Sequence, residues 1–164
     1  MKDALYEKEM FEAYIGTPEK FDWYQKAFDY FDSREGKLSW YWNSWAMIGG
    51  FWYFLYRKQM KVALIILFVT VVLGLLLPVR ILPFALLFLA VALGGFGTFF
   101  VYRQYKEKSK EMETILGDKK KSILLMRYQI GGVNRLAIGM GIFTVVSFVL
   151  IMIGLVVMAG RGVG

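Results

Sequence analysis

The sequence has no cysteine and no histidine among its 164 residues, and it has only three prolines. The missing cysteines exclude disulfides, thiolate catalysis, cysteine metal sites and palmitoylation. The missing histidines remove the commonest general base near neutral pH and the commonest metal ligand. There is also no Gly-x-Ser-x-Gly motif and no Walker loop. We therefore expect a protein that is not an enzyme and that needs no cofactor or metal.

Charge is missing as well, from three long apolar runs at residues 62–77, 81–102 and 136–160. A helix rises about 1.5 Å per residue and the bilayer core is roughly 30 Å thick, so the second and third runs can each cross. The first run is shorter and can cross by including Met60 while Lys58 and Lys61 reach the headgroups. We expect an all-α integral membrane protein with three transmembrane helices, at about 60–77, 81–102 and 136–160.

The distribution of positive charge predicts the orientation. Eighteen of the twenty lysines and arginines lie before residue 62 or within residues 103–135, and the other two are Arg80 and Arg161. By the positive-inside rule, the amino terminus and residues 103–135 are cytoplasmic, while the turn at Arg80 and the tail at 161–164 face outward. The net charge of +7 then reflects topology and contact with the lipid bilayer, so we expect no nucleic-acid partner.

Residues 1–38 are expected to form a cytoplasmic amphipathic helical head of two short helices. Gly16 can end the first in a left-handed cap, and Thr17 and Pro18 suit the start of the second, which runs to about Asp32. Aromatic side chains recur along the second helix at spacings of three and four. They form a candidate partner face of Phe21, Tyr24, Phe28 and Phe31. The alternative is that this stripe packs within the chain itself.

Residues 39–58 are the most aromatic segment and hold four of the five tryptophans. Trp and Tyr collect at the headgroup boundary, and we expect this segment to be an interfacial or re-entrant helix, because its uninterrupted apolar part is too short to cross. If it instead recruited residues 40–44 it could span, and the amino terminus would move outside. The candidate interfacial anchors are Trp40, Trp42, Trp45, Trp52, Tyr56, Arg57 and Lys58.

Three short motifs resemble a known family. They are Tyr14-Ile15-Gly16, then Trp42-Asn43-x-Trp45-Ala46, then Phe51-Trp52-x-x-x-Tyr56-Arg57-Lys58 ahead of an apolar run. Over residues 14–77 the chain resembles small bacterial membrane proteins grouped as domain of unknown function 2628, with no clear counterpart after residue 77. The resemblance implies a multi-pass protein of the bacterial inner membrane, and the family supplies no activity to transfer.

Residues 59–160 are expected to form the membrane domain. Pro78 and Pro83 bracket a tight turn that makes a helical hairpin of the first two crossings. The second crossing carries small residues on one side, a candidate helix–helix face for packing within one subunit or for self-association. This face comprises Ala90, Gly94, Gly97 and Thr98. Residues 103–135 alternate in charge and predict a cytoplasmic helical hairpin; the alternative is a return helix against the inner leaflet.

The leading functional hypothesis is a noncatalytic inner-membrane accessory or scaffold that binds a protein partner through its head or through the small-residue face. The alternative is a homo-oligomeric channel or small-solute permeation unit, which hydroxyl side chains of the crossings would line. These are Thr70, Thr98, Thr144 and Ser147. A lipid-modifying enzyme is the third possibility, with Asn43 and Ser44 as its interfacial polar groups.

Overall fold

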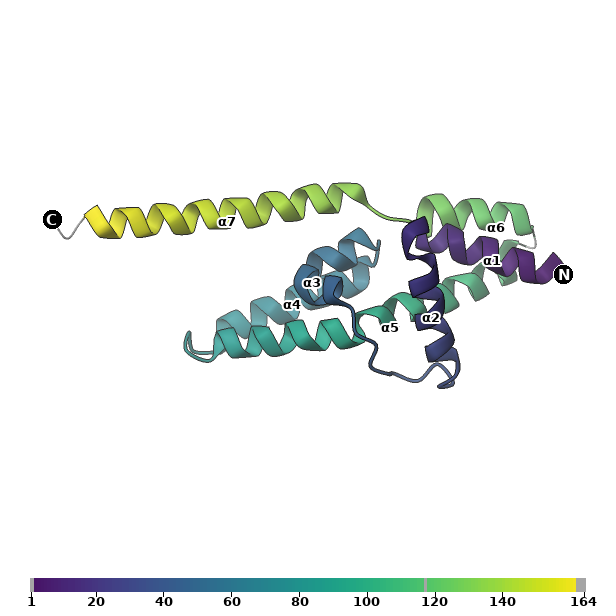
Figure 1. Ribbon diagram of the computed structural model, residues 1–164, viewed down its shortest axis with the longest axis horizontal. Helices are drawn as coiled ribbons and strands as arrows, with labels where there is room; N and C mark the ends of the chain where they lie inside the picture. The colour runs from purple at the N-terminus through teal and green to yellow at the C-terminus, as the bar shows by residue number, and fades with distance from the viewer. Residues whose placement is uncertain (1, 117, 162–164) are drawn as a thin grey trace.

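The computed structural model describes residues 2–116 and 118–161, which form helices and no strand (Figure 1). In chain order they are α1 (Lys2–Ile15), the 3₁₀ turn η1 (Pro18–Lys20), α2 (Phe21–Asp32), α3 (Ser44–Tyr56), α4 (Met60–Leu76), α5 (Leu82–Leu116), α6 (Lys119–Leu125), the π turn η2 (Met126–Ile130) and α7 (Arg135–Arg161). The expected all-α class is confirmed for this part of the chain.

The joint between α1 and α2 follows the expected pattern of residues. Gly16 has a φ of +65°, the left-handed conformation that glycine adopts without strain, and its N–H donates to the carbonyl of Glu12. Pro18 begins η1, where its missing N–H costs no helical hydrogen bond. Thr17 occupies the cap position, but its side chain makes no capping bond to η1. α2 ends at Asp32, as predicted.

α3 is a short helix with a defined start and an internal kink. The side-chain oxygen of Asn43 accepts from the backbone N–H groups of Trp45 and Ala46, which caps the first turn. Gly50 interrupts the helix with a φ of +44°. With 13 residues, α3 is roughly 20 Å long, shorter than the hydrocarbon core of a bilayer. It packs against α4, α5 and the start of α7.

The two-proline turn joins α4 and α5 into the predicted helical hairpin, seen as the two teal helices side by side in Figure 1. α5 then continues well beyond its apolar half, and α6 returns along its charged end. On that end Lys108 pairs with Glu111. α1 packs against α6 and η2, so the head lies against the hairpin predicted for residues 103–135.

Two helical stretches in the described residues are long and apolar enough to cross a membrane, by length and composition alone: Leu82–Thr114 and Lys119–Ser147. The second stretch includes the link at Gly132, where φ is +71°, and enters α7. α4 is apolar after Lys61 but is shorter. The described residues therefore form a helical protein with two candidate spans, and the three crossings expected are not confirmed.

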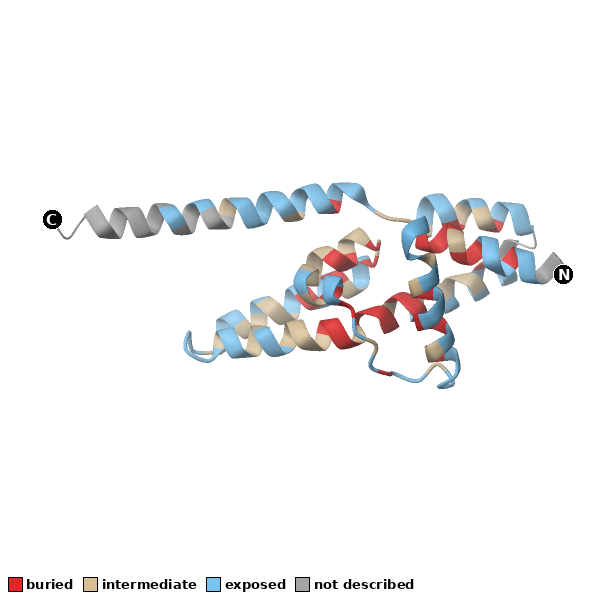
Figure 2. Cartoon of the chain, viewed as in Figure 1, coloured by how far each residue is buried: buried red, intermediate tan, exposed pale blue. Residues whose placement is uncertain are grey.

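Burial is concentrated at one junction. Figure 2 shows the buried residues where α1, α2, α3 and the middle of α5 meet, whereas α4 and the described part of α7 are largely exposed. The core is strongly aromatic, and its fully buried large side chains include Phe31 and Phe54. The fold thus consists of a packed head and α3, from which apolar helices extend.

Candidate functional site

Arg57, at the end of α3, is the most unusual side chain of the core, because it carries a charge and is only 4% exposed. Its Nη1 donates a hydrogen bond of 3.0 Å to the carbonyl oxygen of Ile15, the last residue of α1. Its guanidinium also lies 4.4 Å from the ring centroid of Tyr24. A cation at the carboxyl end of a helix is favoured by the helix dipole, so Arg57 joins α1, α2 and α3 in one contact.

Polar side chains continue this contact into α5. The hydroxyls of Tyr24 and Tyr53 are 3.1 Å apart and share a hydrogen bond. The amide nitrogen of Asn43 donates to the Tyr53 hydroxyl at 3.0 Å and to the hydroxyl of Thr98 at 3.2 Å. The carbonyl oxygen of Asn43 is used by the α3 cap, so both ends of its amide have partners.

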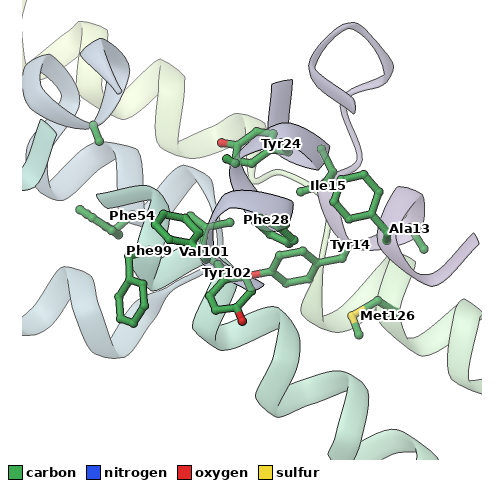
Figure 3. Close-up of a cluster of buried hydrophobic side chains, with 14 of the residues drawn as sticks. Ala13, Tyr14, Ile15, Tyr24, Phe28, Phe54, Phe99, Val101, Tyr102 and Met126 are labelled. Atoms are coloured by element: carbon green, nitrogen blue, oxygen red, sulfur yellow. The ribbon is translucent and has the colours of Figure 1, made fainter. Parts of the chain in front are cut away.

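Tyr14 approaches the same region from α1, and Figure 3 shows its ring lying among the buried side chains of α1 and α5. Its hydroxyl is 2.9 Å from the carbonyl oxygen of Val101 and 2.8 Å from the side-chain oxygen of Gln104. Its backbone carbonyl accepts a hydrogen bond of 2.7 Å from Gly132, which ties the link before α7 to the head. We call this set the Arg57 cluster: Tyr14, Tyr24, Asn43, Tyr53, Arg57, Gln59 and Thr98.

The electrostatics of the cluster keep a fixed positive charge inside the protein. In the part of the chain that the structure describes, no carboxylate forms an ion pair with Arg57. Burial by itself would lower the pKa of the guanidinium, but the surrounding phenols of Tyr24, Tyr53 and Tyr14 raise it above the ordinary value. Burial also raises the pKa of Tyr14. At neutral pH the guanidinium is therefore charged and the Tyr14 phenol is neutral.

Some polar atoms of the cluster lack hydrogen-bond partners. Within the described residues, Nη2 of Arg57 and both amide atoms of Gln59 are buried and make no hydrogen bond of standard geometry, although the Gln59 amide lies close enough to Tyr14 to lower the pKa of that phenol. Gln59 is 2% exposed and lies between α3 and α4. Each such atom costs roughly 1–3 kcal/mol of stability. The cluster is therefore not the most stable arrangement that this core could hold.

The predicted interfacial anchors divide into two groups. Trp40, Trp42 and Trp45 are exposed, as an interfacial role requires, while Trp52, Tyr56 and Lys58 are partly buried. Arg57 was expected to reach the headgroups with Lys58, and that expectation is wrong, because phenol rings and the Ile15 carbonyl surround it instead of water. Lys58 remains accessible and donates to the carbonyl of Tyr128.

The aromatic stripe of α2 packs inside the chain. Tyr24, Phe28 and Phe31 are buried, and Phe21 packs against them at the edge of the core. The rings of Phe28 and Phe31 meet the ring of Tyr102 at centroid distances of 5.3 and 5.2 Å. The candidate partner face is thus covered by α1 and α5, which was the alternative expectation, and these four side chains form no exposed face.

The small-residue face of α5 packs within the subunit as well. A Cβ added at Gly94 would lie 2.9 Å from that of Met47, and one at Gly97 would lie 2.6 Å from that of Ala46, both on α3. Thr98 is fully buried against Asn43, and Ala90, two turns earlier, is partly buried. α3 therefore packs closely against this face, and Gly94, Gly97 and Thr98 lie within the subunit rather than on an exposed surface.

The segment before α3 also packs against the small-residue face of α5. The N–H of Tyr41 donates to the carbonyl of Gly95 and that of Asn43 donates to the carbonyl of Gly94, both at 2.8 Å. The ring of Trp40 lies directly over Gly95, where no Cβ would fit. The extended segment before Ser44 therefore runs against α5, and glycines allow that approach.

The Arg57 cluster was not predicted as a site. Arg57 stands beside Lys58 in the same motif, and no periodicity separates a buried cation from an exposed one. The available signal was the set of three motifs that carry the family resemblance, because Tyr14, Asn43 and Arg57 each come from a different one and meet here. In residues 2–116 and 118–161, no group of three or more acidic side chains could hold a metal ion.

Taken together, the described residues define a helical protein with two candidate membrane spans and the buried Arg57 cluster. The family model described as "Protein of unknown function (DUF2628)" matches residues 6–106, more than half of the chain, so this protein belongs to that family. The match extends past residue 77, so the expected limit of the resemblance was too short. No curated protein matches, and neither does any solved structure.

Proposed function

We propose that this protein is a noncatalytic accessory protein of the bacterial inner membrane, with three crossings and a cytoplasmic head. In this placement α4, α5 and α7 cross, α3 lies at or re-enters from the interface, and α1, α2 and α6 stay in the cytoplasm. Charge supports this placement, because the lysines and arginines lie almost entirely on the head side of the helices. The 17 residues of α4 reach roughly 26 Å, which Lys58 and Lys61 at its start can extend to the headgroups.

The observation that carries the accessory function is the isolation of α7. Among its described side chains Ala137 is buried, but Phe143 is 73% exposed and apolar side chains are exposed on every side of the helix. α7 contacts α3 near its start, where Gly141 lies beside Trp52, and it runs toward the same side of the molecule as α4 and α5 but apart from them (Figure 1). Crossing helices in one protein usually pack on one another.

We therefore propose that α7 is the helix on which a partner membrane protein docks. The aromatic stripe of α2 and the small-residue face of α5 are already filled by this chain, and α4 and α5 pack on each other, whereas the described part of α7 packs on neither of them. The partner would be held by close packing of apolar side chains along α7, with the head fixing the angle of the helix through α3.

Topology is tested first by cysteine labelling. Because the natural sequence has no cysteine, each variant carries a single thiol. Single variants Ser33→Cys in the head and Val79→Cys in the α4–α5 turn place one thiol at an exposed site each. In intact cells, a membrane-impermeant maleimide should label Val79→Cys and should label Ser33→Cys only after the membrane is opened. The reverse pattern would overturn the orientation.

The partner is tested by native mass spectrometry of the full chain in native nanodiscs. A second protein at fixed stoichiometry should be present with the natural sequence and lost when exposed α7 side chains are changed together, as in Phe143→Ala with Ile142→Ala. Matched changes at exposed α4 positions, Phe68→Ala with Ile65→Ala, should retain it. A closed homo-oligomer with no second protein would instead favour the channel, and a monomer in all three samples would overturn the accessory function.

A further inference from the structure

An open groove of about 570 Å³ lies beside α5 where its apolar half ends. Leu38, Phe99 and Phe100 form its apolar surface, and Tyr102, Arg103 and Lys106 line its charged side. Gly36, in the left-handed conformation with a φ of +67°, forms the remaining wall, and a Cβ there would lie 3.2 Å from the Tyr102 hydroxyl. The groove therefore presents an apolar surface and cations side by side.

The cations of the groove are not equally available. Lys106 pairs with Asp32 at 2.9 Å, and Asp32 also accepts from the hydroxyl of Tyr102 at 2.7 Å. Lys37, which stands between Gly36 and Leu38 in the sequence, pairs with Glu35. Arg103 is exposed, and within residues 2–116 and 118–161 it has neither an ion pair nor a hydrogen bond through its side chain. The groove thus carries one uncompensated positive charge, at Arg103.

We propose that this groove binds one anionic phospholipid, with its phosphate at Arg103 and the start of an acyl chain against Leu38, Phe99 and Phe100. The inference rests on the proposed placement of α5 across the membrane. Arg103 is the first charged residue after the apolar run of α5, so it lies at the depth of the lipid phosphates. A guanidinium offers paired N–H donors that match phosphate oxygens.

The combination of surfaces selects this occupant. A free phosphate would use Arg103 and leave the apolar wall of Leu38 and Phe100 facing water, whereas a neutral lipid would leave the arginine without an anion. An anionic lipid satisfies both surfaces at once. Its attraction to each nearby cation is worth about 1 kcal/mol, which corresponds to about fivefold in affinity.

The test is native mass spectrometry of the full chain in detergent, titrated with dioleoyl phosphatidylglycerol or dioleoyl phosphatidylcholine. The natural protein should bind one phosphatidylglycerol in preference to phosphatidylcholine. Arg103→Gln should lower that affinity about fivefold and remove the preference. Lys110→Gln is the matched control, because it removes an exposed cation farther along α5 and outside the groove, and it should leave the affinity within twofold.

Three results would overturn the proposal: equal affinities for the two lipids, equal effects of Arg103→Gln and Lys110→Gln, or displacement of phosphatidylglycerol by inorganic phosphate at millimolar concentration. Leu38→Gln should weaken the lipid without removing the charge preference, which checks the apolar wall separately. The cysteine labelling described above reports the membrane placement without reference to lipid. A correct topology with no effect of Arg103→Gln would therefore reject the groove alone, and a reversed topology would reject the placement.

Discussion

Nη1 of Arg57 and the carbonyl oxygen of Ile15 form a 3.0 Å hydrogen bond between residues 42 positions apart in the sequence. The bond places a buried positive charge at the carboxyl end of α1, and it holds the head against α3. Because the guanidinium also covers the ring of Tyr24, the same side chain fixes α2. Arg57 thus contacts both helices of the head and links them to the end of α3.

Arg57→Met should lower the free energy of unfolding by about 2 kcal/mol. A buried hydrogen bond to a charged group contributes roughly 1.5–3 kcal/mol and a desolvated cation–π contact about 2, while removing the buried charge recovers part of this loss. The measurement is reversible unfolding in mixed micelles followed by tryptophan fluorescence. Lys58→Met removes the neighbouring, accessible cation and should cost less than about 0.5 kcal/mol. Equal losses for the two variants would contradict the role of Arg57.

Gly95→Ala should destabilise the monomer without changing its oligomeric state. The added methyl group would overlap the ring of Trp40, and the segment before α3 would have to leave the carbonyls of Gly94 and Gly95. Overpacking of this kind costs typically 1–3 kcal/mol. Unfolding in micelles gives the stability, and native mass spectrometry gives the oligomeric state. Gly139→Ala on α7, where an added Cβ meets nothing within 4 Å, is the control and should be neutral or stabilising. Loss of an oligomer on Gly95→Ala would instead indicate self-association through α5.

These two sites show which part of the structure the sequence could predict. The apolar runs predicted α4, α5 and α7, because a periodic or continuous apolar pattern reports burial against protein or lipid alike. The spacing of Gly94 and Gly97 predicted close packing for the same reason. The spacing does not say what packs on that face, because the residues that do so, in α3 and at Trp40, are more than 40 residues away in the sequence.

The Arg57 cluster lay beyond the sequence pattern for a different reason. Arg57 and Lys58 are neighbours of equal charge, and which of them is buried depends on the kink at Gly50 and on the end of α1. The sequence likewise predicted the stripe of α2 as an apolar face, but only the fold shows that Tyr102 and α1 cover it. Local periodicity predicts that a face will be covered, and long-range contacts decide by what.

Gly50→Ala should cost about 1–2 kcal/mol although there is open space for the methyl group. No atom lies within 4 Å of a Cβ built there, so the whole effect comes from the φ of +44°, which alanine adopts with strain. Gly74→Ala in α4 is a matched control, because its Cβ also meets nothing, but its backbone is helical. It should be neutral or stabilising when unfolding is followed in the same micelles. Equal stability of the two variants would show that α3 is straight in the membrane.

Tyr14→Phe should change how stability depends on pH. At pH 7 the loss of a buried hydroxyl bonded to Val101 or Gln104 should cost about 1 kcal/mol. Burial raises the pKa of Tyr14 above its ordinary 10.0, so the folded protein holds the phenol proton more tightly than the unfolded chain does. Its contribution is therefore complete below pH 10 and falls by about 1.4 kcal/mol per pH unit above it.

The difference between the natural protein and Tyr14→Phe isolates this group from the other tyrosines and lysines. It should be constant from pH 7 to 9 and should fall to about zero or below between pH 10 and 11, when thermal unfolding is followed by circular dichroism. A difference that stays constant through pH 11 would mean that Tyr14 is solvated in the membrane-bound protein.

Gln59→Met should increase the stability of the protein by roughly 1–3 kcal/mol, because it replaces two unpaired, buried amide atoms with an apolar side chain of similar length. The backbone bonds of residue 59, from its N–H to Phe54 and from Ala63 to its carbonyl, do not involve the side chain and should persist. Unfolding in mixed micelles measures the change, with Gln25→Met on the exposed face of α2 as the control, expected to lie within about 0.5 kcal/mol. If Gln59→Met is instead destabilising, the amide has hydrogen-bond partners in solution, and Arg57 and Gln59 then act as one hydrated polar group. If Gln59→Met is stabilising, the natural core between α3 and α4 is less stable than an apolar core would be. Any movement of the head relative to the membrane helices must bend the chain at this point.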